Sequence, residues 1–153
     1  MITYKTGNLL DDDADALVNT VNTVGVMGKG LAFQFKQRFP AMAEEYSRRC
    51  RFNIVEVGTM DVHRMPDGQH IINFPTKRHW RNRSRVDWIQ RGLDDLAFVI
   101  EHLRIKSIAL PKLGSGLGGL DWDNEVHPLV IEAFGDMEDV DVRVYSEPPK
   151  VER

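Results

Sequence analysis

Residues 18–33, VNTVNTVGVMGKGLAF, constrain the fold more than any other part of the chain. An apolar strand-like run ends at Asn22, three glycines allow a tight turn, and a helix-forming run begins at Leu31. A strand, glycine turn and helix N-terminus together gather unpaired backbone N–H groups and the positive end of the helix dipole at one point. The stretch therefore predicts an anion-binding site, and phosphate is the first candidate.

A second glycine-rich stretch, KLGSGLGGLDWDNE, follows the buried strand expected at residues 106–111. In parallel sheets, ligands bind outside the carboxyl ends of the strands, where both glycine stretches are expected. One such turn is as readily a turn without a ligand, whereas two on one edge favour a diphosphate clamp. Neither stretch has P-loop spacing, and the second fits the dinucleotide fingerprint only in part, so a kinase or ATPase is disfavoured.

The rest of the chain alternates strands and helices, which predicts an α/β domain with a mixed or mostly parallel sheet covered on both faces. Strands are expected at residues 2–6, 16–21, 55–64, 69–74, 106–111 and 140–145. Helices are expected at residues 31–39, 41–50, 86–103 and 123–134. Apolar residues at three- and four-residue spacing mark the third helix. Ser84, just before this helix, and Asp87, in its first turn, resemble a capping box.

A chain of 153 residues, 42% of them hydrophobic, is long enough for a single core, and no linker divides it. We expect one domain at residues 1–147, a tail or the start of a linker at residues 148–153, and a monomer. The sequence has no run apolar enough to span a membrane and no signal peptide, which predicts a cytoplasmic protein. The single cysteine, Cys50, has no disulfide partner and is expected to be a small helix residue.

Three consecutive aspartates, Asp11, Asp12 and Asp13, lie in a segment rich in turn formers, so a solvated loop is the simplest interpretation. A metal site is disfavoured because such loops space their acids alternately and add a distant glutamate. Four histidines are assigned to ordinary structure for want of companion ligands: His63, His70, His102 and His127. No metal and no cofactor is expected.

Residues 77–85, KRHWRNRSR, hold five of the 20 basic residues and no acid, whereas the other 15 share the chain with 23 acidic residues. This pattern predicts local attraction to a polyanion. Basic side chains bind phosphates and aromatic side chains stack on unpaired bases, so the loop suits a single nucleic-acid strand. The alternative is a solvated loop with Trp80 packed back onto the core. The candidate contacts are Arg78, His79, Trp80, Arg81, Arg83 and Arg85.

The segments NTVNTVGVMGKGLAFQFK, FPTKRHW and PKLGSGLGGLDW resemble the signature segments of macrodomains, the ADP-ribose-binding α/β/α modules. The resemblance is nearer to the DarG antitoxin branch, which is similar to the terminal ADP-ribose glycohydrolases, and it runs over residues 4–145. It implies a three-layer α/β/α fold with a central mixed sheet, and hydrolysis of the bond between ADP-ribose and an acceptor. In the DarG branch, the implied acceptor is a thymine base in single-stranded DNA, modified by the toxin DarT, which becomes a candidate partner.

The resemblance also implies roles for individual residues. Asn22 matches the asparagine that faces the distal ribose, and Lys77 matches the catalytic lysine. Asn8 falls where many macrodomains hold an aspartate that contacts adenine, and an asparagine can accept that hydrogen bond without charge assistance. The other implied ADP-ribose contacts are Leu9, Val21, Gly28, Lys29, Gly30, Leu113, Gly114, Ser115, Gly116, Leu117 and Gly118.

Two mechanisms fit Lys77. A neutral lysine, its pKa lowered by burial or by Arg78, can attack the anomeric carbon, and a protonated lysine can stabilise charge on the departing base. The glycohydrolases carry a catalytic aspartate where this chain has Gly118, so release of a covalent adduct lacks that carboxylate. Direct attack by water, aided by Asn22, gains weight. Asp121 is expected to cap the next helix instead.

Other interpretations stay open at this point. On residue chemistry alone, Asn22 can equally cap the strand exit, and Lys77 can equally belong to a solvated basic loop. Two further functions also fit the resemblance: an ADP-ribose reader without turnover, and a hydrolase that acts on ADP-ribosylated protein carboxylates.

Overall fold

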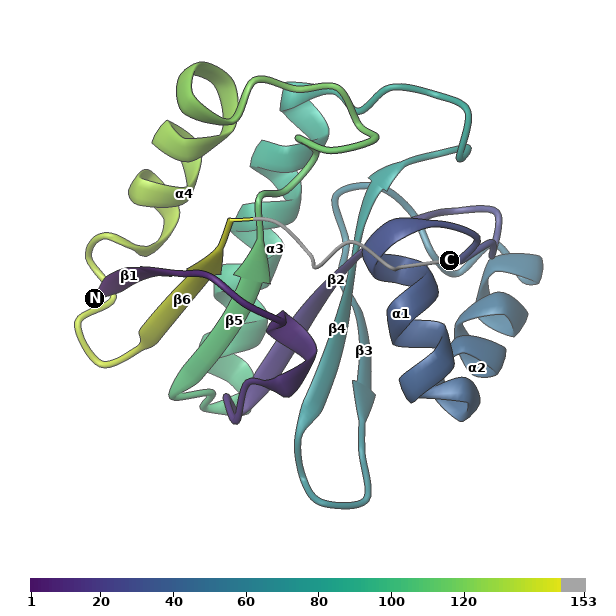
Figure 1. The fold of residues 1–153 in the computed structure, drawn as a ribbon, viewed down its shortest axis with the longest axis horizontal. Coiled ribbons are helices and arrows are strands. Elements are labelled where there is room, and N and C mark those ends of the chain that lie inside the picture. The colour runs from purple at the N-terminus through teal and green to yellow at the C-terminus, as the bar shows by residue number, and fades with distance from the viewer. Residues whose placement is uncertain (147–153) are drawn as a thin grey trace.

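A computed structural model describes residues 1–146 of the chain, and its centre is a six-stranded sheet of order β1-β6-β5-β2-β4-β3 (Figure 1). The strands are β1 (Ile2–Lys5), β2 (Ala16–Asn22), β3 (Asp61–Arg64), β4 (His70–Lys77), β5 (Ser107–Pro111) and β6 (Asp141–Tyr145). Neighbouring strands pair in parallel, except that β3 pairs with β4 in antiparallel register. The expected mixed sheet is confirmed, and the expected tail at residues 148–153 lies outside the described residues.

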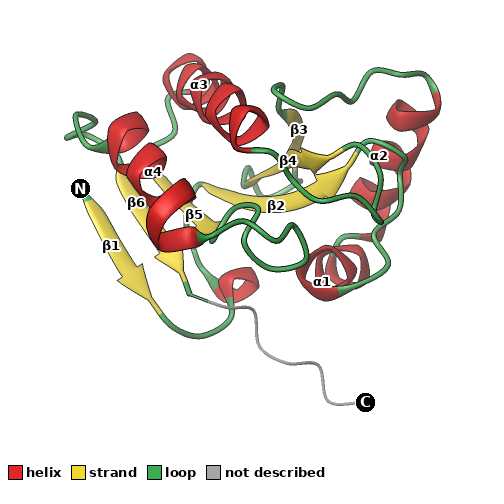
Figure 2. Cartoon of the chain, turned by 90° about the horizontal axis from the view of Figure 1, so that it is seen from above, coloured by secondary structure: helices red, strands yellow, loops and turns green. Residues whose placement is uncertain are grey.

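Helices cover both faces of this sheet (Figure 2). They are α1 (Gly30–Arg38), α2 (Pro40–Arg51), α3 (Val86–Leu103) and α4 (His127–Phe134), with a 3-10 turn η1 (Leu9–Asp11) and a π-helical segment η2 (Trp122–Val126). The α3 and α4 helices lie on one face, and α1, α2 and η1 lie on the other. The three-layer α/β/α architecture is therefore confirmed. No helix within residues 1–146 is both long enough and apolar enough to cross a membrane.

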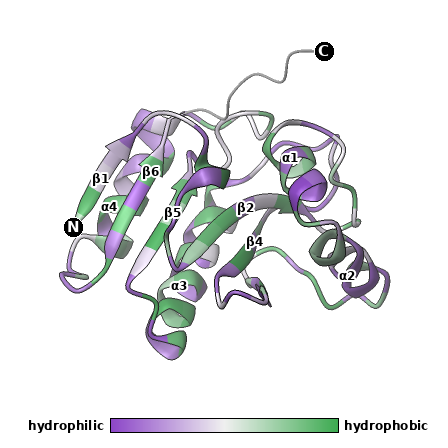
Figure 3. Ribbon diagram, turned by 60° about the horizontal axis from the view of Figure 1, so that its bottom comes forward, coloured by the Kyte–Doolittle hydropathy of each residue, from purple (hydrophilic) through white to green (hydrophobic). Residues whose placement is uncertain are grey.

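Alternation along the strands explains the two covered faces. In β2, Ala16 and Val18 pack against the core under α3 and α4, whereas Leu17 and Val21 pack against the core under α1 and α2. The central strands are consequently apolar on both sides, and they appear largely green in Figure 3, while much of α2 is purple. The sheet thus forms a rigid platform, and its carboxyl edge is free to carry loops.

Two expectations at the element boundaries are wrong. The strand expected from residue 55 begins at Asp61, because residues 56–59 form a turn in which the Thr59 N–H donates to Glu56 O (3.3 Å) and Gly58 has a φ of +88°. Ser84 does not cap α3, because Arg85 occupies the N-cap position and makes no side-chain cap bond. Asp121 caps η2 as expected, since its carboxylate accepts a hydrogen bond from the Asn124 N–H (3.3 Å).

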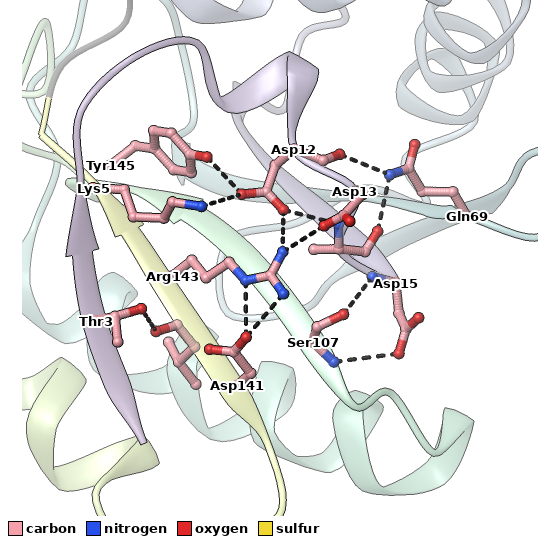
Figure 4. A network of polar contacts seen from close by, with 12 residues as sticks. Thr3, Lys5, Asp12, Asp13, Asp15, Gln69, Ser107, Asp141, Arg143 and Tyr145 are labelled. Carbon is pink, nitrogen blue, oxygen red and sulfur yellow. Dashed lines mark hydrogen bonds and ion pairs between the residues drawn. The ribbon is translucent and has the colours of Figure 1, made fainter.

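The aspartate run is not a purely solvated loop. Asp12 is buried, and it accepts hydrogen bonds from Arg143, from the Tyr145 hydroxyl and from the Ala14 N–H (2.8 Å), as Figure 4 shows in part. Burial alone would raise the pKa of the Asp12 carboxyl, but these hydrogen bonds outweigh it and hold the pKa below its usual range. The aspartate run therefore connects η1 to β6 through the Asp12 side chain.

Candidate functional site

Two loops meet where β2 and β4 end. Asn22 and Lys77 are register partners on these adjacent parallel strands, next to a register shift at Val21 and Asn22. Immediately beyond them, Arg78 O accepts hydrogen bonds from both the Thr23 N–H (3.3 Å) and the Thr23 hydroxyl (2.9 Å). The first glycine loop and the basic loop are thus joined at the residues predicted to lie at the reacting centre.

The second glycine loop reaches the same place. The Lys77 ammonium donates to Trp80 O (3.2 Å) and to Leu117 O (3.4 Å), so Lys77 links the basic loop to the second glycine loop. The Ser84 N–H donates to Gly118 O (2.9 Å), and the Arg83 guanidinium donates to Gly119 O (2.8 Å). Three loops from three strands therefore converge on one edge of the sheet, as the two glycine stretches predicted.

The Asn22 side chain organises the first glycine loop. Its Oδ1 accepts hydrogen bonds from the N–H groups of Val24 (3.1 Å), Gly25 (3.1 Å) and Val26 (3.3 Å). Three converging N–H groups require an oxygen at that position, which fixes the orientation of the amide. Nδ2 donates to Val26 O (2.8 Å), which leaves its second hydrogen for a ligand. Asn22 thus caps the strand exit and can also donate one hydrogen bond to a ribose hydroxyl.

Two residues of α2 that the sequence did not identify hold this loop in place. The Tyr46 hydroxyl lies 2.7 Å from Asn22 O and 3.0 Å from Asn22 Oδ1, and Tyr46 is fully buried. Burial raises the pKa of the Tyr46 phenol, which keeps it a hydrogen-bond donor. The Ser47 hydroxyl donates to Gly25 O (2.6 Å). Met42, Tyr46 and Cys50 share the four-residue spacing of a core stripe, and that spacing does not indicate a polar role for the Tyr46 hydroxyl.

Both glycine loops present unpaired backbone N–H groups. Within residues 1–146, no acceptor faces the N–H groups of Gly28, Lys29 and Gly30, and Lys29 adds no side-chain cap to α1. The same holds for the N–H groups of residues 116–118 in the second loop, where Gly114 turns the chain with a φ of +70°. Such groups at a helix N-terminus and in a glycine loop form anion sites. The geometry therefore fits the predicted diphosphate clamp.

The side chains of four predicted ligand contacts are occupied by the fold. Leu9 and Val21 are 2% and 4% exposed in the core beneath α1, so they can offer a ligand little besides their main chain. The Asn8 side chain accepts a hydrogen bond from the Leu10 N–H (3.0 Å), which caps η1. The Ser115 hydroxyl donates to the carbonyl of the buried Leu113 (3.2 Å), so it must rotate to reach a phosphate.

Gly118 has no room for a side chain. A Cβ there would lie 2.5 Å from Gly114 O and 2.5 Å from the Ser84 hydroxyl, which is buried and has no hydrogen-bond partner within residues 1–146. The second loop is therefore closed around the glycine hydrogen. A carboxylate at position 118 would need this loop to take another path.

The candidate catalytic lysine is half-buried at the end of β4. Burial lowers the pKa of Lys77, because removal from water disfavours the ammonium form. Its two carbonyl acceptors favour the same ammonium form, since a charged donor makes the stronger hydrogen bonds. Lys77 thus combines a lowered pKa with two carbonyl acceptors at the point where the three loops meet.

Trp80 projects from the basic loop rather than packing onto the core, so the folded-back alternative is wrong. Trp80 is 45% exposed, the His79 ring lies 4.8 Å away at a tilt of 33°, and the Arg81 guanidinium lies 4.6 Å from the Trp80 ring centre. Arg78 and Arg85 instead lie 5.3 Å and 5.6 Å from the ring of Trp88, at the start of α3. The loop therefore presents an aromatic and basic surface beside Lys77.

Comparisons with known proteins agree with this geometry. Residues 18–128 match the family model of the Macro domain. The chain belongs to the macrodomain family. The macrodomain of Mycobacterium tuberculosis DarG superposes with a TM-score of 0.92 at 51% identity, covering 98% of this macrodomain and 99% of that chain. The predicted family and fold are confirmed.

Longer relatives match the same residues. This macrodomain is 50% identical over 148 residues to a Mycobacterium tuberculosis protein named DNA ADP-ribosyl glycohydrolase, covering 95% of this macrodomain and 42% of that protein. Thermosipho africanus DarTG, solved in complex with ADP-ribose, matches with a TM-score of 0.85 at 32% identity, covering 98% of this macrodomain and 43% of that chain. The macrodomain thus spans less than half the length of these relatives.

Proposed function

We propose that this macrodomain hydrolyses the bond between ADP-ribose and thymine bases of single-stranded DNA, as the antitoxin to a DNA ADP-ribosyltransferase. The observation that carries the proposal is the convergence of three loops at one edge of the sheet. Two of them offer unpaired N–H groups to a diphosphate, and the third begins with Lys77 and continues into an exposed aromatic and basic surface. The relatives named for this activity on DNA, and the DarTG structure with ADP-ribose, support the same assignment.

The chemistry follows from the groups at this edge. Water adds its oxygen to the anomeric carbon of the distal ribose, the bond to the thymine nitrogen breaks, and a proton from water ends on that nitrogen. Asn22 donates its free amide hydrogen to a ribose hydroxyl, because its oxygen is already filled by backbone donors. The Lys77 ammonium stabilises the negative charge that develops on the departing base. This assignment is favoured because Gly118 leaves no carboxylate to release a lysine adduct.

The basic loop is the proposed contact to the DNA strand. Arg81 and Trp80 offer a guanidinium and an indole face on one exposed surface, which suits phosphates and unpaired bases. By contrast, Arg83 is engaged with Gly119 O and its proposed role is mainly to hold the second loop. The cytoplasmic location, the monomeric state and the toxin partner remain predictions from the sequence.

The test compares acceptors directly. We expect the protein to release ADP-ribose from a thymine-modified single-stranded oligonucleotide and to act slowly or not at all on a peptide ADP-ribosylated on glutamate. Arg81→Gln should slow the DNA reaction. Arg64→Gln should not, because Arg64 pairs with His70 at the start of β4, the end of that strand away from Lys77. Faster release from the peptide would move the acceptor to protein carboxylates and contradict the proposal.

The second candidate function is an ADP-ribose reader, and the absence of a side chain at Gly118 favours it over the hydrolases that use an aspartate there. A reader would bind ADP-ribose tightly in calorimetry and leave both the modified oligonucleotide and the modified peptide intact. Turnover of the oligonucleotide excludes this candidate.

A further inference from the structure

The end of α2 carries two apolar side chains that the site described above does not use. Phe52 is 70% exposed and Ile54 is 65% exposed, and they flank Asn53, which has a left-handed φ of 57°. The Ile54 N–H donates to Arg49 O (3.0 Å) and the Asn53 N–H donates to Cys50 O (3.0 Å). These two bonds form a Schellman motif, in which the residue at the Ile54 position frequently packs back against the helix. Here it faces solvent instead.

This turn is rigidly held, so the exposure of its side chains is built into the backbone. The Phe52 N–H also lies within hydrogen-bond distance of Arg48 O (3.3 Å) and Arg49 O (3.2 Å). Large exposed apolar side chains close together in sequence on a fixed backbone are candidates for a contact surface. Two exposed arginines precede them, and within residues 1–146 Arg51 has no ion-pair partner. We call Arg48, Arg51, Phe52 and Ile54 the flanking surface.

Residues next to the flanking surface contact the candidate site in two places. The Ser47 hydroxyl, one turn before Arg51, binds Gly25 O in the first glycine loop (2.6 Å). Glu56, two residues after Ile54, forms an ion pair with Arg78 at the start of the basic loop (3.4 Å). In Figure 1 the segment after α2 runs along the same edge of the sheet as the end of β4.

The charges around the flanking surface indicate what kind of partner it binds. Glu45 is engaged by Arg48 and Arg49, and Glu56 is engaged by Arg78, so these two acidic groups are paired with arginines. Glu44, one turn before Arg48, has no ion pair within residues 1–146. An aromatic ring, an aliphatic side chain and unpaired guanidinium charge on one exposed turn suit unpaired bases joined by phosphates. A protein partner could pack against the same apolar side chains, but only an acidic protein would complement the positive charge.

We propose that the flanking surface binds nucleotides that adjoin the modified base, so that a DNA strand passes from the basic loop across the end of α2. This inference rests on the proposed function for the location of the modified base. It extends the proposed DNA contacts beyond residues 77–85 to the end of α2. Phe52 and Ile54 contact bases in this arrangement, and Arg51 contacts a phosphate.

Fluorescence anisotropy with unmodified single-stranded oligonucleotides tests this directly. Site sizes of about 4 to 16 nucleotides are usual for such surfaces, so one oligonucleotide from each end of that range is compared. Phe52→Ala should raise the Kd for the long oligonucleotide about fivefold or more and leave the Kd for the short one unchanged. Phe98→Ala is the matched control, because Phe98 is 63% exposed on α3. Arg51→Ala should reduce the salt dependence of binding by about one phosphate contact, with Arg64→Ala as its control.

Each result decides the inference. It is overturned if Phe52→Ala and Arg51→Ala bind the long oligonucleotide as the wild type does, which would instead assign the surface to a protein partner. It is also overturned if Phe52→Ala and Phe98→Ala weaken binding equally. If the wild-type protein binds DNA through Phe52 but releases no ADP-ribose from the modified oligonucleotide, the inference holds and the proposed function fails.

Discussion

Removing one buried hydroxyl should weaken ADP-ribose binding from a distance. In Tyr46→Phe, the main-chain and side-chain oxygens of Asn22 lose a donor that lies 2.7 Å and 3.0 Å away. Tyr46 is fully buried, so water does not replace the missing donor without opening the core. A buried hydrogen bond contributes about 1 kcal/mol, and a group left unsatisfied costs about 1–3 kcal/mol.

The loss should appear in both stability and binding. We expect the free energy of unfolding to fall by about 1–2 kcal/mol, measured in urea. The Kd for ADP-ribose should rise about five- to tenfold in calorimetry, since the first glycine loop no longer has one fixed conformation and 1.4 kcal/mol corresponds to a factor of ten. Tyr4→Phe is the matched control, because Tyr4 also loses a hydroxyl hydrogen bond, to His127, but lies on β1 and is 57% exposed.

An unchanged Kd for ADP-ribose in Tyr46→Phe would refute this reasoning, even if the variant were less stable. Such a result would mean that the three backbone N–H groups hold the Asn22 oxygen without help from α2. A purely structural role for Tyr46 predicts that outcome. The binding measurement therefore separates positioning of the site from general support of the fold.

Three further predictions follow from the same geometry. With Lys77 acting as an ammonium, kcat should be constant at low pH and fall as pH rises through the lowered pKa of Lys77, and a rise over that range would instead indicate a neutral nucleophile. Gly118→Ala should cost about 1–3 kcal/mol of stability in urea, whereas Gly116→Ala, whose Cβ would meet nothing within 4 Å, should cost far less. Arg143→Met should destabilise the protein by about 1–3 kcal/mol at neutral pH, because it removes the guanidinium from the buried Asp12 and leaves the more distant Lys5 ammonium (3.7 Å) as its counter-charge. Since Asp12 has a lowered pKa, its stabilising effect is present above the unfolded-state pKa and disappears as pH falls through the folded-state pKa, so the deficit of Arg143→Met should shrink in acid.

Local patterns in the sequence predicted the elements of the fold, because the packed sheet and helices require the same patterns of apolar residues. The stripe of apolar residues in 86–103 became α3 with the predicted bounds, and the two glycine stretches lie at the carboxyl edge of the sheet as expected. The resemblance alone implied that Lys77 and Asn22 share a reacting centre, and the structure makes them register partners on neighbouring parallel strands. The bounds of α3 and the positions of the glycine stretches depend on local periodicity, which can be read from the sequence, whereas the order of the strands in the sheet cannot.

Contacts between distant side chains could not be predicted in this way. Asp12 is buried because Arg143, on a strand more than a hundred residues later, lies beside it, and nothing in the aspartate run indicates that partner. The Tyr46 ring is buried in the core while its hydroxyl reaches Asn22, and no local pattern indicates that hydrogen bond. Ser84 matched a capping box, yet its backbone N–H is used by Gly118 O, which places it under the second glycine loop instead.

The most direct test of the central claim is single-turnover release of ADP-ribose from a thymine-modified oligonucleotide by the wild type, Lys77→Ala and Lys106→Ala. Lys106 is the control because it precedes β5, at the edge of the sheet away from the three loops. We predict rapid release by the wild type and by Lys106→Ala. Lys77→Ala should release none while binding ADP-ribose with similar affinity. Release by Lys77→Ala at the wild-type rate would contradict the account.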